Sequence, residues 1–220
     1  MGRAADTAYT AIKERIVRGR LTPNTTVDES EIANELGMSR TPVREALLRL
    51  QTESLVDIAR GRGIRVLPIS ITDMREAYQV ISGLEMVAVQ LLSERAPDAA
   101  YLAPLAETVA RMRAAQDAGD VMGWCDADED FHRTLMRLSG NTRLASAGIQ
   151  MRDFARRAHV VAVRLQSAEY TRTSTENHAA LVDALASGSF ELAVEKHLLQ
   201  RRRGEGLLIG AVEAMNFSAL

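Results

Sequence analysis

Residues 39–47 read SRTPVREAL, and this stretch predicts the start of a helix with two different faces. Ser39 or Thr41 can cap the first free backbone N–H groups. Pro42 falls in the first turn, where its fixed φ and missing N–H cost little. Apolar residues recur at positions 43, 46, 47 and 50, which is helical spacing, so one face must pack on a core.

The opposite face of this helix is basic. Arg40 and Arg44 are spaced i, i+4, which places their guanidinium groups side by side near the helix N-terminus. Arginine suits both guanine edges and phosphates, and the helix dipole adds attraction for phosphate. Upstream, residues 31–36 predict a short helix that ends at Gly37. Helix, glycine turn and helix follow the order of a helix-turn-helix motif.

A β-hairpin is predicted directly after this motif. Residues 60–66 form a basic, glycine-containing tip that enters a β-branched strand, and residues 55–58 are the expected partner strand. A hairpin in this place is the wing of a winged helix. The order and spacing of these features within 67 residues favour contact with double-stranded DNA over a merely solvated surface.

Residues 8–67 resemble the N-terminal domain of GntR-type bacterial transcription regulators, whose most characteristic run matches residues 39–47 nearly letter for letter. The resemblance implies contacts with operator DNA from the recognition helix and from the tip of the wing. The predicted DNA-binding residues are Ser39, Arg40, Thr41, Arg44, Arg60, Gly61 and Arg62. Two positions depart from the family: Asn24 replaces a usual glycine, and Ser30 stands where some members carry a DNA-contacting arginine.

Composition and charge favour two domains. The chain has 220 residues, 46% of them hydrophobic, which is enough for two cores. Residues 1–67 carry 11 Lys or Arg against 9 Asp or Glu, whereas the remainder carries 16 against 20. Cys125 is the only cysteine, and no signal run or apolar stretch of about 18 residues is present. We therefore expect a cytoplasmic protein that does not bind membranes.

The rest of the chain predicts a helical bundle. After a connector at residues 68–71, apolar residues keep a helical period from 77 to 92. Further helices are expected over about 98–118, 121–138 and 142–166, with two more flanking residues 187–189. The predicted fold is therefore mainly α, with a winged helix-turn-helix and its small hairpin at residues 1–67. Residues 72–220 form an antiparallel bundle of about six or seven helices.

One aspartate and three histidines of this bundle can meet at a single point. Asp128 and His132 are spaced i, i+4 and project to the same side of one helix. His178 and His197 precede and follow Gly188 by similar distances, so they lie at equal height, roughly 14 Å from the turn, in an antiparallel pair. Such a set suits a divalent transition metal, although unrelated histidines are an equally good interpretation of the spacing alone.

Residues 72 to about 215 resemble the FCD effector domain of FadR-type regulators, in which an Asp and three His hold a metal. The resemblance implies that the ligands here are Asp128, His132, His178 and His197, with Zn, Ni or Mn as the metal. A metal with open coordination positions would accept a small organic acid as effector. His159 has no counterpart in that motif and is expected in the core or the pocket wall.

Arginines are the usual second partner of a carboxylate effector. The candidate effector-binding residues are Arg152, Arg156 and His159. Arg157 lies on the same predicted helix, and at least two of these three arginines are expected on its exposed face. The first bundle helix has Tyr-Gln-Val-Ile at 78–81 and lacks an arginine that many FCD domains carry there. The run at 201–203 is expected to be a solvated turn near the C-terminus.

These features predict a homodimeric, metabolite-responsive regulator, in the first instance a repressor, that binds operator DNA. An alternative is a metal-dependent enzyme of organic-acid metabolism with an accessory DNA-binding domain. That alternative needs a base beside the metal, and Glu129 and Asp130 are expected on the wrong side of their helix. A further alternative is a metal-free regulator that binds an acyl-CoA in the bundle.

Overall fold

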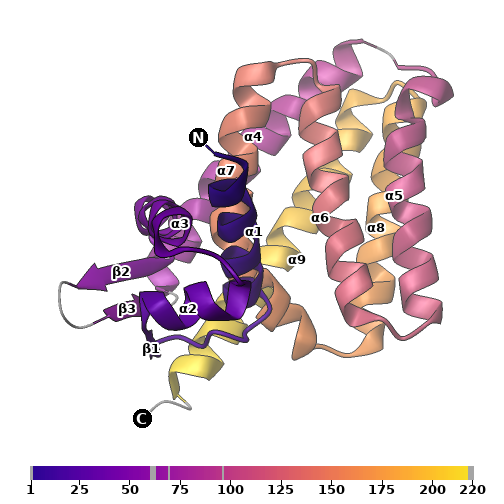
Figure 1. Ribbon diagram of the computed structural model, residues 1–220. Helices are drawn as coiled ribbons and strands as arrows, with labels where there is room; N and C mark the ends of the chain where they lie inside the picture. The colour runs from indigo at the N-terminus through magenta and orange to yellow at the C-terminus, as the bar shows by residue number, and fades with distance from the viewer. Residues whose placement is uncertain (1, 60–62, 69, 96, 218–220) are drawn as a thin grey trace. The chain divides into compact units, whose positions relative to one another are not determined.

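The computed structural model describes residues 2–59, 63–68, 70–95 and 97–217 (Figure 1). The chain divides into two compact units, Met1–Ser70 and Ile71–Leu220, each with its own core. Helices dominate both units, and the described strands all belong to the first. The predicted fold class is confirmed.

The first unit combines three helices with a small antiparallel sheet. Its elements are α1 (Arg3–Val17), β1 (Thr26–Val27), α2 (Glu29–Leu36), α3 (Arg40–Thr52), β2 (Val56–Ala59) and β3 (Gly63–Val66). The strands lie in the order β1-β3-β2. Helix α1 and strand β1 were not predicted from the sequence. Helix α1 packs against α3 and supplies much of the apolar surface on which α3 rests.

The predicted apolar face of α3 is confirmed, since Val43, Ala46, Leu47 and Leu50 are all buried. Ser39 occupies the N-cap position, but its side chain makes no capping hydrogen bond. The preceding helix α2 is capped by Asp28 and ends at Gly37 in the left-handed conformation, with φ 63°. The wing also forms as predicted, because Val56 pairs with Val66 and Ile58 with Ile64 across the hairpin.

The backbone conformation of Asn24 shows why asparagine can stand where the GntR resemblance predicts a glycine. Its φ is 65°, in the left-handed region that glycine adopts without strain. Asparagine is among the few other residues that tolerate this conformation. The backbone turn that leads into β1 is therefore kept although the glycine is lost.

The second unit is a bundle of long helices connected by short turns. They are α4 (Ile71–Glu94), α5 (Ala99–Asp117), α6 (Val121–Leu138), α7 (Thr142–Arg164), α8 (Ala168–Ala186) and α9 (Phe190–Phe217). Gly119, Gly140 and Gly188 lie in the turns with positive φ, as their places in the sequence indicated. The expected turn at 201–203 is wrong, because these residues continue α9.

Helix α6 lies inside the bundle, in contact with α4, α5 and α7 (Figure 1). Trp124 and Phe131 on this helix are among the largest side chains that are fully buried. Asp128 and His132 lie on the same buried face, so polar side chains enter the core at this level. Within the described part of the chain, no helix is both long and apolar enough to cross a membrane.

Candidate functional site

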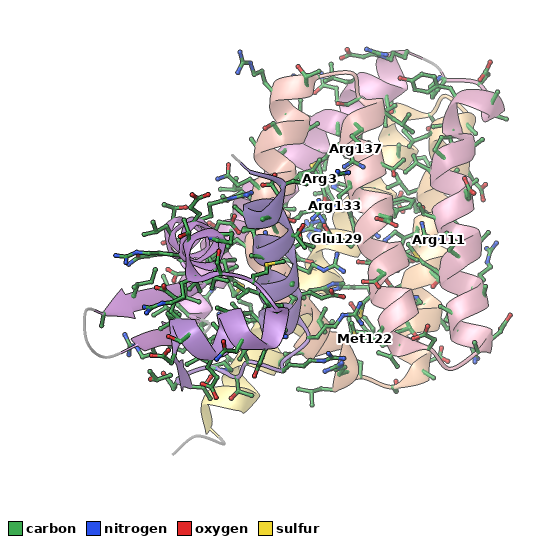
Figure 2. The ribbon with its side chains drawn as sticks, in the orientation of Figure 1. Arg3, Arg111, Met122, Glu129, Arg133 and Arg137 are labelled. Carbon is green, nitrogen blue, oxygen red and sulfur yellow. The ribbon has the colours of Figure 1, made fainter. Side chains whose placement is uncertain are left out.

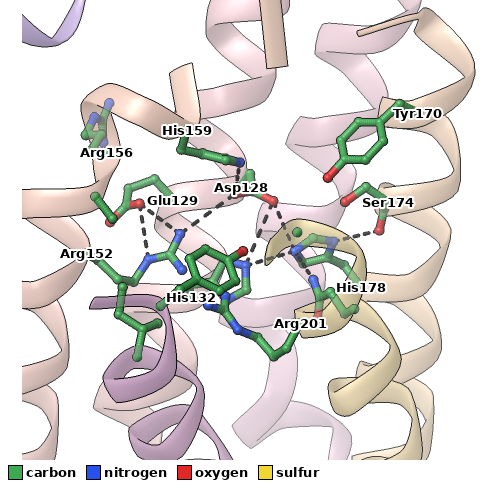
Figure 3. A pocket seen from close by; sticks show the side chains of 15 residues that line it. Asp128, Glu129, His132, Arg152, Arg156, His159, Tyr170, Ser174, His178 and Arg201 are labelled. Atoms are coloured by element: carbon green, nitrogen blue, oxygen red, sulfur yellow. Dashed lines mark hydrogen bonds and ion pairs between the residues drawn. The ribbon is translucent and has the colours of Figure 1, made fainter. Parts of the chain in front are cut away.

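The bundle core holds a cluster of three side chains that can bind one metal ion (Figure 3). Asp128 and His132 come from α6, and His178 comes from α8. The Nε2 atom of His178 lies 3.2 Å from Oδ1 of Asp128 and 3.4 Å from Nε2 of His132. Nε2 of His132 lies 3.9 Å from the same aspartate oxygen. All three side chains are buried, so water competes little for these atoms.

Polar neighbours orient the two imidazoles toward this point, one through a hydrogen bond and the other through a nearby carboxylate. Nδ1 of His178 donates to the backbone carbonyl oxygen of Ser174 at 2.7 Å, which leaves the lone pair on Nε2. Nδ1 of His132 lies 3.1 Å from Oε1 of Glu85 on α4. A carboxylate or carbonyl behind each imidazole is the usual arrangement around metal-binding histidines, because it fixes the tautomer and the ring orientation.

The distances within the cluster fit a metal ion. Nitrogen and oxygen ligands about 2.1 Å from a cation lie roughly 3.0–3.4 Å apart when their angle at the metal is between square and tetrahedral. The His178 distances to Asp128 and His132 are of this size, and the 3.9 Å separation requires only a wider angle or a small adjustment. Imidazole and carboxylate ligands together suit Zn, Ni or Mn.

His197 lies on α9 and is fully buried, but its ligand atoms are not within the cluster of the other three. Its Nε2 atom is 3.8 Å from Oε2 of Glu85, and neither ring nitrogen has a hydrogen-bond partner. Burial lowers the pKa of His197 to about 3, so the imidazole is neutral. A buried imidazole without a partner is costly, and a bound cation would offset that cost.

A buried network of charges surrounds the cluster. Arg152 on α7 donates from Nε and Nη2 to Oε2 of Glu129, at 3.1 and 2.9 Å, and from Nη1 to Glu85 at 3.0 Å. Glu129 also accepts from Arg133 on its own helix at 2.7 Å (Figure 2). Glu129 therefore belongs to the site. The expectation that it faces away from Asp128 and His132 on α6 is wrong. Asp130 does point outward and pairs with Arg111 at 2.8 Å.

The same network corrects the expectation of an exposed arginine face on α7. Arg152 and Arg157 are 7% and 6% exposed, so two of the three arginines are buried. Only Arg156 is partly exposed, and it pairs with Asp126. The physical reason is that α7 packs against α4, α6 and α9 and carries polar side chains into the buried pocket.

The charges of the network fix the protonation of its members. Burial alone would raise the pKa of Glu129, but Arg152 and Arg133 lower it to about 2. Burial of the Asp128 carboxyl is likewise outweighed by the imidazoles around it, so its pKa is below the usual range. Burial and the nearby Arg152 lower the pKa of His132 to about 4, although Glu85 and Asp128 oppose this shift. At neutral pH the carboxyls are ionised and His132 is neutral.

Arg201 on α9 also enters the site, contrary to the expected solvated turn. It is 4% exposed, its Nε donates to the Ser82 hydroxyl at 3.0 Å, and its Nη1 lies 3.3 Å from Oε2 of Glu85. The guanidinium carbon lies 3.9 Å from the centre of the Tyr78 ring. Its neighbour Gln200 is in close contact with Nε2 of His178 through the side-chain amide nitrogen.

These side chains enclose a small cavity that the candidate effector residues line. Arg152, Arg156 and His159 all contribute to its wall, and Nε2 of His159 lies 3.6 Å from Oδ2 of Asp128. The cavity measures about 30 Å³, which is room for about two water molecules. Charged and polar groups form most of the wall, so a long apolar ligand has little to contact there.

The predicted DNA-binding side chains of α3 lie on an exposed face. Ser39, Arg40, Thr41 and Arg44 are all accessible to solvent. Arg40 is 3.2 Å from Glu29 of α2, whereas Arg44 has no partner among the described residues. Arg60, Gly61 and Arg62, the predicted wing tip, lie outside the described residues.

Sequence reasoning missed several residues of the bundle site. Glu85 and Arg201 lie far apart in the sequence, and no local motif connects them. The one available signal was Glu85 itself. It lies one turn after Ile81, at a position of α4 that the helical period assigns to the core, where an ionisable residue is unusual.

Comparison with known proteins agrees with this architecture. Residues 4–66 match the family described as bacterial regulatory proteins, gntR family, and residues 76–200 match the FCD domain. The chain is 40% identical over 131 residues to an uncharacterized HTH-type transcriptional regulator of Agrobacterium vitis, covering 59% of this chain and 77% of the relative.

It is also 32% identical to a probable D-xylose utilization operon transcriptional repressor of Paenarthrobacter nicotinovorans, covering 81% of this chain and 76% of that protein. Among solved structures, E. coli McbR/YncC superposes with a TM-score of 0.82 at 24% identity, covering 94% of this chain and 98% of that one. This last similarity concerns the fold alone.

Proposed function

Because the chain belongs to the GntR family of bacterial regulatory proteins and carries an FCD domain, we propose that it is a metabolite-responsive repressor that binds operator DNA. The relatives that it matches are transcriptional regulators, so the chain is a regulator and not the metal-dependent enzyme considered above. Since such a regulator must reach operator DNA, a cytoplasmic location belongs to the same proposal.

The exposed N-terminus of α3 is the observation that carries the DNA-binding half of this proposal. Arg40 and Arg44 project from consecutive turns while the opposite face of the helix is held in the core. In a helix-turn-helix protein such side chains reach base edges in the major groove. Ser39 and Thr41 would contact bases or phosphates beside them, and Arg60, Gly61 and Arg62 would enter the minor groove.

The buried cluster in the bundle carries the effector half. We assign Asp128, His132, His178 and His197 as the residues that would hold a divalent Zn, Ni or Mn ion. When bound, such a cation supplies a positive charge that attracts the carboxylate of a small organic acid. Arg152, Arg156 and His159 line the same cavity. The charged wall argues against the alternative of an acyl-CoA ligand, whose chain needs an apolar one.

A homodimer follows from the way such proteins read DNA, since paired recognition helices match a pseudo-palindromic operator. Helix α4 offers an apolar surface for this contact. Val80 and Val87 lie two turns apart on it and are 49% and 43% exposed. Effector binding would then change DNA affinity only if the two arrangements of the dimer bind the effector with different strength.

Selection from random-sequence duplex DNA tests the first half of the proposal. The full-length protein should enrich a sequence with two related half-sites, and nuclease footprinting should show protection of both. Enrichment of no sequence, or of a single unrepeated site, would contradict the proposed dimeric repressor.

Metal analysis tests the second half. Protein purified without chelator should contain about one divalent ion per chain, and a double variant, His178→Ala with His197→Ala, should contain none while remaining helical. Stoichiometric metal in the double variant would show that the ion is held elsewhere.

A further inference from the structure

The described residues that line the cavity include three arginines, and among them only Arg201 has a buried donor nitrogen without a hydrogen-bond partner. Arg152 is occupied on both edges by Glu129 and Glu85. Arg156 is partly exposed and pairs with Asp126. Arg201 uses Nε and Nη1 for Ser82 and Glu85, but its Nη2 is buried and has no hydrogen-bond partner.

A buried guanidinium nitrogen without an acceptor needs an explanation, because such donors are nearly always satisfied in native proteins. Two features hold Arg201 where it is although Nη2 stays unsatisfied. The Tyr78 ring lies against the guanidinium group, with 3.9 Å between its centre and the guanidinium carbon. Gly204, one turn further along α9, makes room for this ring, since a Cβ at 204 would lie 2.2 Å from the Tyr78 hydroxyl oxygen.

Arg201 also lines the same cavity as Asp128, His132 and His178. It follows His197 by four residues on α9, so both project to the same face of the helix. Its neighbour Gln200 contacts the metal-facing nitrogen of His178. An anion in the cavity can therefore reach the histidine cluster and Arg201 together.

We propose that Arg201 anchors the carboxylate of a small, singly charged organic acid through its free Nη2 edge, beside the metal ligands. This inference rests on the proposed function, since it names the residue and the ligand class of the same effector site. It also moves the anchoring role to a residue of α9, because both edges of Arg152 are occupied and Arg156 is partly exposed.

The charge of the site argues for one carboxylate. Three buried carboxylates, Glu85, Asp128 and Glu129, face two buried guanidinium groups, Arg152 and Arg201, which leaves a single negative charge. Histidines that hold a metal are neutral. A divalent cation would turn the balance to a single positive charge, and one carboxylate would neutralise it. A second carboxylate would restore an unpaired negative charge in a buried, water-poor site.

The test is a thermal-shift titration of the full-length, Zn²⁺-loaded protein with butyrate and with succinate, which have the same number of carbon atoms. Zinc content is measured first for each protein. Ligand affinity follows from the dependence of the unfolding midpoint on ligand concentration. We expect wild-type protein to bind butyrate more tightly than succinate.

Arg201→Gln should weaken butyrate binding roughly tenfold or more, because a charge-assisted hydrogen bond is lost. The matched control is Arg202→Gln, which removes the same charge from an exposed neighbour and should leave the affinity unchanged within about twofold. Should Arg201→Gln fail to fold, Gly204→Ala displaces Tyr78 from Arg201 without removing a charge, and it should also weaken butyrate binding.

The outcomes separate this inference from the proposed function. Three results would overturn the role of Arg201. Butyrate binding could be unchanged in folded, zinc-loaded Arg201→Gln, or butyrate binding could be lost only in Arg156→Gln. The wild-type protein could also bind succinate more tightly than butyrate. Wild-type protein that holds no zinc, or that responds to neither acid, would overturn the effector half of the proposed function and this inference with it.

Discussion

Two nitrogens of Arg152 converge on a single oxygen of Glu129, at 3.1 and 2.9 Å, inside the helical bundle. Arg156, one turn further along α7, pairs instead with the partly exposed Asp126. The two arginines therefore differ in burial although they lie on the same helix and have the same charge. This difference sets what each contributes to stability.

Arg152→Ala should destabilise the protein by about 3–5 kcal/mol, because it leaves Glu129 and Glu85 buried without their partner. Arg156→Ala should cost less than about 1 kcal/mol, since its pair is partly solvated. Urea unfolding followed by circular dichroism gives both values. Equal losses in the two variants would show that the Glu129 pair contributes no more than a surface ion pair.

His178→Ala should lower zinc affinity by more than about 100-fold, because the variant loses a ligand that Ser174 has already oriented. His159→Ala is the control. Its imidazole lies 3.6 Å from Asp128 but is not in the cluster, so a smaller decrease is expected. Competition with a chromophoric chelator measures both affinities. Equal decreases would mean that His159 is also a ligand.

The metal-free protein should lose stability as the pH falls from 6.5 to 4. The pKa of His132 is about 4 in the native state, whereas an unfolded histidine has a pKa of about 6.5. Above pH 6.5 the imidazole is neutral in both states. Below it the unfolded chain binds a proton that the native state does not, so roughly 3 kcal/mol is lost by pH 4.

Urea titrations in chelator at pH 7.5, 6 and 5 measure this slope. His132→Asn removes the titrating group, so the stability of this variant should depend less on pH than that of wild-type protein. The same slope in both proteins would assign the pH dependence to other groups.

Arg44→Ala should weaken binding to the selected operator by roughly 1–3 kcal/mol and leave the bundle folded. The control is Arg137→Ala, which removes an exposed arginine from α6 in the other unit (Figure 2). Fluorescence anisotropy at a fixed salt concentration compares the two variants. Unchanged affinity of Arg44→Ala would refute the assignment of α3 as the recognition helix.

Local patterns predicted most of the secondary structure. The helical period of α3, the glycine turn at Gly37 and the alternating strands of the wing are each set by residues close together in the sequence. The turns of the bundle are marked by glycines with positive φ for the same reason. Helix α1 was not predicted, although Ala8, Ile12 and Ile16 recur at helical spacing and are buried.

The sequence by itself also determined which residue types can form the metal cluster, since Asp128 and His132 share one helix face through their i, i+4 spacing. Only the tertiary structure decided which charges surround them. Glu85, Arg152 and Arg201 come from three different helices, so no local sequence pattern connects them. Their burial depends on helix packing, because a buried charge is stable only where another helix supplies its partner.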